Sequence, residues 1–264
     1  MGAWDNYVAT MSSIGRTKHD MWVNHSRDSL RRRMYDSPAC HIVTIDGVEQ
    51  AITVTHRDKL YQKRICAMPG ESLRHGGLVE FAGNRWLITE VDADNEVYER
   101  GIMLQCNHVL RWISKDGRLI EKWCYVEDGT KYLIGEFSDR LMSIGDARIA
   151  LTIGKDEDTV ELSRGLRFLI DDMDSDNVTA YQITKSNRLF NNFNGEGVFK
   201  FILNEVTLTD DDHRQLRVAN YSNWRPKREL DGDHKDAEYT VAQIVEAAKD
   251  KAQTPPDDDK EVWL

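Results

Sequence analysis

The sequence predicts a mainly β protein built from two tandem small β-barrel or sandwich modules, with an N-terminal helical arm and a flexible, acidic C-terminal tail. Short apolar runs separated by turn residues fill the region between Gly76 and Leu208, and this region shows no sustained helical period. Two stretches within it also repeat the same order of strands and turns. The predicted divisions are the arm at 1–37, the first module at 38–130, the second module at 131–225 and the tail at 226–264.

Composition excludes several classes of protein. The chain has 264 residues, of which 30% are charged and 9% aromatic, and its mean hydropathy is -0.58. No apolar run approaches the ~20 residues that a membrane-spanning helix needs, so we expect no membrane partner. The aromatic content argues against complete disorder. The net charge of -10 argues against a nucleic-acid coat protein, although residues 1–75 carry a net charge of +3.

The N-terminal arm is predicted to be helical from Trp4 to about Arg33, because apolar residues recur there at helical spacing and proline is absent. Cations gather near the end of this helix, where they suit its dipole. They form either a solvated basic face or a surface for an acidic partner or a DNA backbone. These candidate interaction residues are Arg27, Arg31, Arg32 and Arg33.

Pro38 ends the helix, and a β-hairpin follows around the turn Asp46-Gly47. Further strands are expected on either side of the turns Gly83-Asn84 and Asp116-Gly117, with one continuous strand covering Gly101–Ile113. Bulky aromatic residues on these strands are interpreted as core or interface packing. They are Trp86, Trp112, Trp123 and Tyr125.

An internal repeat relates residues 75–112 to residues 163–208. Each stretch has a Gly-Leu pair, an apolar strand, a turn, an aromatic residue two positions before an Ile-Thr pair, a loop, a glycine and an alternating strand. The matched positions are Gly77-Leu78 with Gly165-Leu166, Trp86 with Tyr181, Ile88-Thr89 with Ile183-Thr184, and Gly101 with Gly197. The repeat predicts two copies of one small barrel, which would act as a rigid scaffold with loops free to reach neighbours.

No catalytic residue, cofactor site or metal site is predicted. The phosphate-binding, dinucleotide-binding, serine-hydrolase and zinc-protease motifs are absent from the sequence. His75, beside two glycines, is interpreted as a solvated loop residue. Three acidic clusters offer oxygen ligands of the kind that calcium prefers, but aspartate is also an ordinary turn residue. The clusters are Asp92, Asp94, Asn95 and Glu96; Asp171, Asp172, Asp174 and Asp176; and Asp210, Asp211 and Asp212.

The four cysteines favour a reducing compartment. They are Cys40, Cys66, Cys106 and Cys124, and their wide spacing contains no Cys-x-x-Cys pair. We interpret them as small buried thiols, with a scattered Cys/His zinc site as the alternative. The N-terminal residues lack the basic and apolar regions of a signal peptide, so the chain is expected to remain in the cytoplasm where it is made.

The acidic tail ends in an apolar tip. Residues 254–259 have a disordered-type composition, and the chain finishes with Val262, Trp263 and Leu264. Trp263 and Leu264 are therefore candidate interaction residues that either dock on another surface or fray as termini commonly do.

With the repeat in place, residues 75–208 resemble head–tail connector proteins of tailed bacteriophages, of the head-closure or stopper kind. The resemblance is a pattern of strands and turns, without a catalytic signature. Its first half is met by Gly77, Val79, Trp86–Thr89, Arg100-Gly101, Met103, Cys106-Asn107, Leu110 and Trp112. Its second half is met by Arg164–Ile170 and Gly197–Glu205.

The resemblance implies a structural virion protein that is assembled in the host cytoplasm and forms a homo-oligomeric ring. Its partners would be the portal or adaptor protein and tail or capsid proteins, with non-specific proximity to packaged DNA. Rings need two different patches on each subunit, which a basic arm and an acidic tail could supply. The alternatives are a capsid auxiliary (decoration) protein, a tail structural protein, or a calcium-binding or metal-dependent module.

Overall fold

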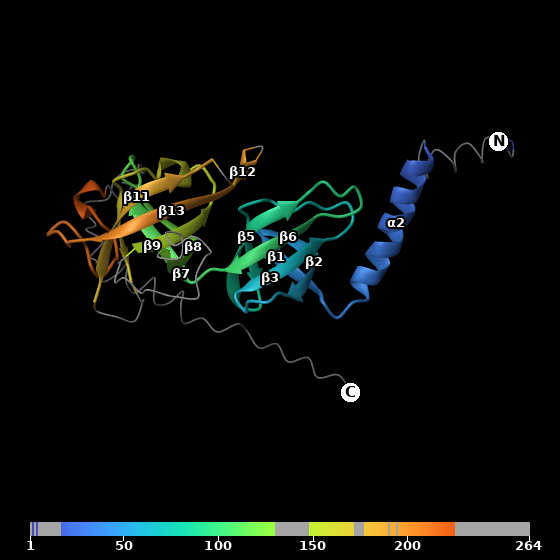
Figure 1. Cartoon of the computed structure of the whole chain (residues 1–264), viewed down its shortest axis with the longest axis horizontal. Helices are drawn as coiled ribbons and strands as arrows, with labels where there is room; N and C mark the ends of the chain where they lie inside the picture. Colours follow the sequence, from blue (N-terminus) through green and yellow to red (C-terminus); the bar gives the residue numbers. More distant parts are fainter. Residues whose placement is uncertain are drawn as a thin grey trace, which may run out of the picture. The chain divides into compact units, whose positions relative to one another are not determined.

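The structure, a computed structural model, describes Gly2, Trp4 and residues 17–129, 148–171, 177–189, 191–193 and 195–224. Within these residues one α-helix precedes two groups of antiparallel strands (Figure 1). The prediction of a mainly β chain with two barrel-like sheets and an N-terminal helix is confirmed. The predicted acidic tail, including Trp263 and Leu264, lies outside the described residues.

Helix α2 (Lys18–Tyr35) begins at a reciprocal cap. The hydroxyl of Thr17 accepts a hydrogen bond from the backbone N–H of Asp20, and the Asp20 carboxylate accepts one from the backbone N–H of Thr17. This arrangement satisfies two N–H groups that the first helical turn leaves without partners. The helix ends at Tyr35, two residues beyond the predicted end, and Pro38 follows.

Six strands form the first barrel: β1 (Cys40–Ile45), β2 (Val48–His56), β3 (Gln62–Ala67), β4 (Leu78–Phe81), β5 (Asn84–Asp92) and β6 (Arg100–Gln105). Their order is β1-β2-β3-β6-β5-β4, and pairing of β1 with β4 closes the barrel. The predicted turn Asp46-Gly47 joins β1 to β2 with both φ angles positive, as a two-residue hairpin loop of this kind requires. The next hairpin turns at Ala82-Gly83, one residue before the predicted Gly83-Asn84, because Asn84 already pairs with Phe81.

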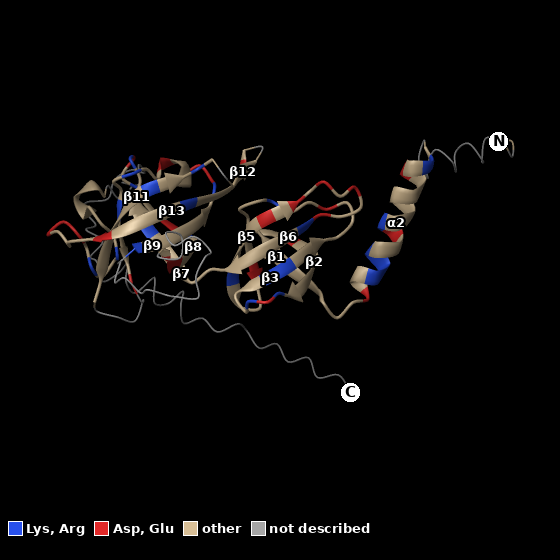
Figure 2. Ribbon diagram, in the orientation of Figure 1, with Lys and Arg blue, Asp and Glu red and all other residues tan. Residues whose placement is uncertain are grey.

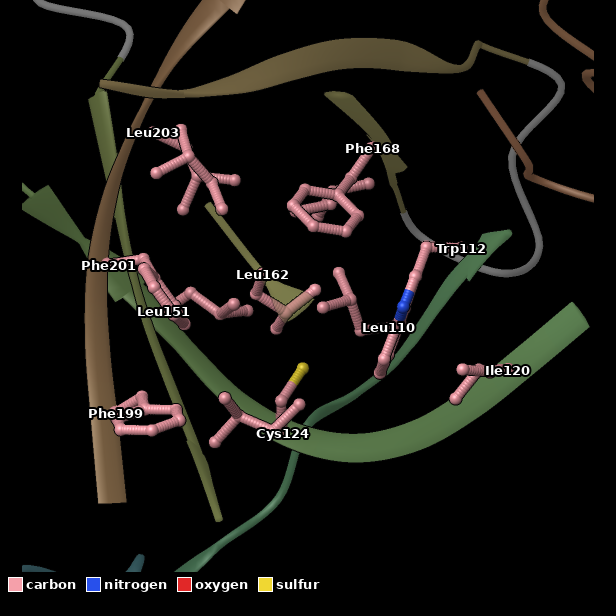
Figure 3. Close-up of a cluster of buried hydrophobic side chains, with 13 residues drawn as sticks. Leu110, Trp112, Ile120, Cys124, Leu151, Leu162, Phe168, Phe199, Phe201 and Leu203 are labelled. Carbon is pink, nitrogen blue, oxygen red and sulfur yellow. The ribbon is translucent and has the colours of Figure 1, made fainter. Parts of the chain in front are cut away.

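Seven strands form the second sheet: β7 (His108–Ile113), β8 (Leu119–Asp128), β9 (Arg148–Gly154), β10 (Arg167–Ile170), β11 (Thr179–Asn187), β12 (Asn192–Phe193) and β13 (Glu196–Val206). The main order is β7-β8-β9-β13-β11-β10, and the short β12 pairs with β13. Short 3-10 helices occupy Thr159–Glu161 and Tyr221–Asn223. Aliphatic and aromatic side chains from the strands point toward one another to form the core (Figure 3). The labelled members are Leu110, Trp112, Ile120, Cys124, Leu151, Leu162, Phe168, Phe199, Phe201 and Leu203.

The expected continuous strand over Gly101–Ile113 is divided between the two sheets. The backbone N–H of Cys106 donates to the Arg85 carbonyl in the first barrel, whereas that of Asn107 donates to the Cys124 carbonyl in β8. The Asn107 side chain also pairs with the backbone of Val126 through two hydrogen bonds of 2.7 and 2.8 Å. Strands β7 and β8 therefore belong to the second sheet, and the first barrel ends at Gln105 instead of at residue 130.

The two sheets repeat one topology. Replacing β1, β2, β3, β4, β5 and β6 by β7, β8, β9, β10, β11 and β13 converts the first strand order into the second. Both copies also contain the same bulge, because pairing shifts register between Ile88 and Glu90 and again between Ile183 and Lys185. The threonine in each bulge donates its hydroxyl proton to a carbonyl of the neighbouring strand. The Ile-Thr pairs noticed in the sequence mark this shared bulge.

Two of the glycine pairs that the sequence repeat matched do not correspond in the structure. Gly76, not Gly77, corresponds to Gly165, because each donates its backbone N–H to the isoleucine of the bulge and each has a positive φ. Gly101 corresponds to Phe201, because these residues hold the same place relative to the two bulges. Gly197 lies four residues earlier, beside the hairpin formed by β12 and β13.

Candidate interaction surfaces

Two of the four candidate arginines bind the chain's own first barrel. Arg27 donates from its guanidinium to the carbonyl of Glu96, with an Nε–O distance of 2.8 Å, and Arg31 donates to the carbonyl of Pro69 at 2.5 Å. His19 lies 2.6 Å from the Glu96 carboxylate on the same side of the helix. These contacts tie α2 to the β5–β6 loop and to the loop after β3, so Arg27 and Arg31 position the helix.

We expect Arg27→Met to loosen α2 by about 1 kcal/mol, because the substitution keeps the aliphatic stem and removes the hydrogen bonds to the Glu96 carbonyl. Hydrogen–deuterium exchange of the intact chain would show exchange of the α2 amides about fivefold faster. Arg32→Met is the matched control, since Arg32 is exposed and on the same helix. Equal exchange in both variants would contradict the anchoring role.

A second face of α2 points away from these anchors, and we call it the outer face. Helical spacing places its members on one side. Trp22 leaves 63% of its surface exposed and contacts His25 edge to face, with ring centroids 6.4 Å apart. The outer face consists of Lys18, Trp22, His25, Arg32 and Arg33, all exposed. Figure 2 shows the Lys and Arg positions along α2. Arg32 and Arg33 thus remain exposed, whereas Arg27 and Arg31, also candidate interaction residues, bind the chain's own barrel.

A cleft of about 900 Å³ lies beside the β1–β2 turn, and we call it the acidic cleft. Its walls come from that turn, from residues 72–75, from the end of β5 with its loop, and from β12 with the start of β13. Its charged side chains are five carboxylates and one arginine, together with a histidine. They are Asp46, Asp92, Asp94, Glu99, Glu196, Arg74 and His75. The cleft therefore carries an excess of negative charge.

Three of the five carboxylates have partners. Asp46 pairs with Arg74 at 2.9 Å, Asp92 pairs with Arg100 at 2.7 Å, and Glu99 accepts a hydrogen bond from the backbone N–H of Leu73. Asp94 and Glu196 form no ion pair within the part of the chain that the structure describes. Their charges are therefore free to attract a cationic partner.

His75, interpreted from sequence as a solvated loop residue, instead connects the two sheets. Its Nε2 donates to the Thr89 carbonyl at 2.8 Å, and its ring stacks on Phe193 of β12 with centroids 5.8 Å apart. One ring nitrogen and one ring face are thus already in use. This arrangement suits a structural contact better than proton transfer.

Glycines allow the backbones of the two sheets to meet. A Cβ atom on Gly76 would overlap the carbonyl oxygen of Gly197, and one on Gly154 would overlap the carbonyl oxygen of Gly76. Buried Leu87, Cys106 and Val198 form an apolar cluster that joins residues of both sheets. These positions require glycine because a side chain would force the backbones apart. The sheets are therefore packed directly against each other.

The acidic residues of the three sequence clusters have different surroundings in the structure. Asp211 accepts two hydrogen bonds from Ser222, and Asp212 is buried beside Arg167. In the cluster that begins at Asp171, residues 172–176 lie outside the described residues. Among the residues that the structure describes, no three His, Cys, Asp or Glu side chains are grouped so that they could hold a metal ion.

The four cysteines are free thiols, and burial raises the pKa values of three of them. Cys106 and Cys124 are buried, and Cys40 and Cys66 are half-buried, all as free thiols. Burial raises the pKa of the Cys106 thiol to about 12 and raises the pKa values of Cys66 and Cys124 as well. Because the thiolate is the reactive form, these three residues are poor nucleophiles and metal ligands.

The described residues define a β protein of two like modules preceded by a helix. Residues 18–105 match the family model described as the YomX N-terminal domain, a phage-related family. The match covers about one third of the chain. It begins at the first residue of α2 and ends at the last residue of β6, so it consists of the helix and the first barrel.

No curated protein and no solved structure matches the chain significantly. Among the described residues, α2 and the shorter helices are not long and apolar enough to cross a membrane. The comparisons therefore support a phage-related domain at 18–105.

Proposed function

We propose that this chain is a structural virion protein of a tailed phage that forms part of the head–tail connector, as a head-closure or adaptor ring between portal and tail, without catalysis. The observation that carries the proposal is the match of α2 and the first barrel to a phage-related domain. The connector-like pattern over residues 75–208 supports it, since that pattern continues into the second copy of the barrel.

The structural features suit a ring subunit. A subunit in a ring needs two different patches that meet on adjacent copies. The described part of the chain offers a cationic outer face on α2 and a separate acidic cleft. Direct packing of the two sheets, through the glycine contacts and the His75–Phe193 stack, would keep such patches at a constant spacing.

The proposed partners are further copies of the chain, the portal or adaptor protein, and tail or capsid proteins, in the assembled virion. Non-specific proximity to packaged DNA follows from a place on the exit path. No cofactor is part of the proposal. His75, Asp211 and Asp212 support a role without catalysis, because each already makes structural hydrogen bonds.

The test is to locate and count the chain in intact particles and to delete its gene. We expect a few copies at one vertex by electron microscopy and quantitative protein analysis, and DNA-filled heads that lose their DNA and lack tails in the deletion mutant. Hundreds of copies over the head would indicate a capsid auxiliary protein. Copies along the tail would indicate a tail structural protein, and either result would contradict the connector.

A further inference from the structure

We propose that copies of this chain associate head to tail, with the outer face of α2 on one copy bound in the acidic cleft of the next. The inference deepens the proposed function, because it names the surfaces by which a ring would form. The same association is expected of the purified protein, wherever the chain lies in a particle.

Helix α2 directs its outer face away from its own barrel, where a neighbouring copy can reach it. Arg27 and Arg31 bind backbone carbonyls of the first barrel from the opposite side of the helix. Trp22, 63% exposed, lies between cationic residues on the outer face. Tryptophan and arginine, both present on the outer face, are enriched among the residues that contribute most binding energy at protein interfaces.

The acidic cleft complements this face in both charge and character. Asp94 and Glu196 lack ion pairs within the described residues, so they can receive Arg32 and Arg33 of another copy. The cleft also contains exposed apolar surface, with Val48 at 68% and Phe193 at 62% exposed. A cleft of about 900 Å³ lined in this way can accept an aromatic side chain between cations.

The outer face and the acidic cleft are different patches, so their contact is heterologous and a bound pair of copies leaves one patch of each kind unused. Repetition of the contact gives a ring if the rotation closes and a filament if it does not. Almost all residues of both patches lie within 18–105, which is the phage-related domain, and only Phe193 and Glu196 come from the second sheet.

The experiment measures self-association of the full chain by sedimentation over a range of concentration and salt. The wild-type chain should associate, and less so at higher salt because the contact is electrostatic. The helix variant Arg32→Gln with Arg33→Gln and the cleft variant Asp94→Asn with Glu196→Gln should each weaken association about tenfold or more. Lys185→Gln with Arg214→Gln is the control, since both residues are exposed and lie outside the two patches.

Mixing the two variants provides the decisive observation. The helix variant retains its acidic cleft and the cleft variant retains its outer face, so an equal mixture should form dimers that grow no further. A wild-type chain that stays monomeric throughout, or a mixture that forms no dimer, overturns the proposal. It is also overturned if the helix variant loses binding to a DNA duplex while self-association is unchanged, which would assign the outer face to nucleic acid.

The result of the self-association experiment is independent of whether the chain is a connector protein. Finding the chain on the capsid surface or along the tail would contradict the proposed function and leave a measured head-to-tail contact intact. Conversely, a chain found at the portal vertex that fails the mixing test would keep its proposed function and lose this interface.

Discussion

Asp212→Ala is expected to lower the free energy of unfolding by about 3–5 kcal/mol, the largest effect we predict for a single side chain. The Asp212 side chain is fully buried, and its Oδ2 lies 2.7 Å from a guanidinium nitrogen of Arg167, itself only 14% exposed. Removal of the carboxylate would leave the largely buried Arg167 guanidinium without its counter-charge. An uncompensated buried charge costs more than the intact pair contributes.

The same carboxylate organises the chain after β13. It accepts hydrogen bonds from the backbone N–H groups of Thr209 and Asn220, while Arg167 donates to the carbonyl of Thr207 and the hydroxyl of Thr209. Burial alone would raise the pKa of the Asp212 carboxyl, but these hydrogen bonds and the charge of Arg167 hold it below its usual value. Its stabilising contribution is therefore present near neutral pH and is lost as pH falls through that lowered pKa.

Urea unfolding at neutral pH would measure the loss. Asp211→Ala is the matched control, because Asp211 is the preceding residue and its two hydrogen bonds to Ser222 are exposed. We expect that control to cost about 1 kcal/mol or less. Similar losses in both variants would show that Asp212 does not hold a buried charge pair.

The Asp212–Arg167 pair illustrates what sequence reasoning missed. The residues are 45 positions apart, and Asp210–Asp212 has the composition of an ordinary turn, so local sequence contains no sign of the partner. Only the register of β10 beside the segment after β13 brings the two together. Contacts of this kind depend on tertiary structure, whereas turns depend on local backbone preferences.

The elements that depend on local backbone preferences were predictable from the sequence. Asp46-Gly47 adopts the backbone that its hairpin requires, and Pro38 follows the end of α2. The division of the strand at Cys106-Asn107 was not predictable, because the alternating apolar pattern continues through it. That pattern does not indicate which sheet each half joins. The Ile-Thr repeat correctly predicted two barrel-like sheets, while the glycines were matched out of register because they serve different turns and contacts.

For the interaction surfaces, the sequence indicated the basic end of α2 but did not separate its two roles. Spacing alone does not say that Arg27 and Arg31 bind the barrel while Arg32 and Arg33 stay exposed. The acidic cleft was also missed as a unit. Its carboxylates come from separate turns and from both sheets, and only the folded chain assembles them.

Acidification from pH 6.5 to pH 4 is expected to destabilise the chain by about 3 kcal/mol through His108 alone. His108 lies on β7 with 7% of its surface exposed, and its Nε2 has no hydrogen-bond partner among the described residues. Burial lowers its pKa from 6.5 to about 4, and the charges of Arg217 and Arg111 add to this effect while Asp171 opposes it. The folded chain therefore keeps this imidazole neutral at pH values where the unfolded chain protonates it.

The direction follows from counting protons. Between pH 6.5 and pH 4 the unfolded state binds one more proton at this position, so stability decreases as pH falls and the contribution is fully present only above pH 6.5. Urea unfolding at several pH values should show the wild type losing about 3 kcal/mol relative to His108→Gln, which stays neutral. His25→Gln is the control, because it makes the same substitution at an exposed histidine on α2. Parallel pH profiles for the wild type and His108→Gln would mean that the folded chain accepts the proton, and that the site around His108 admits water or a counter-charge.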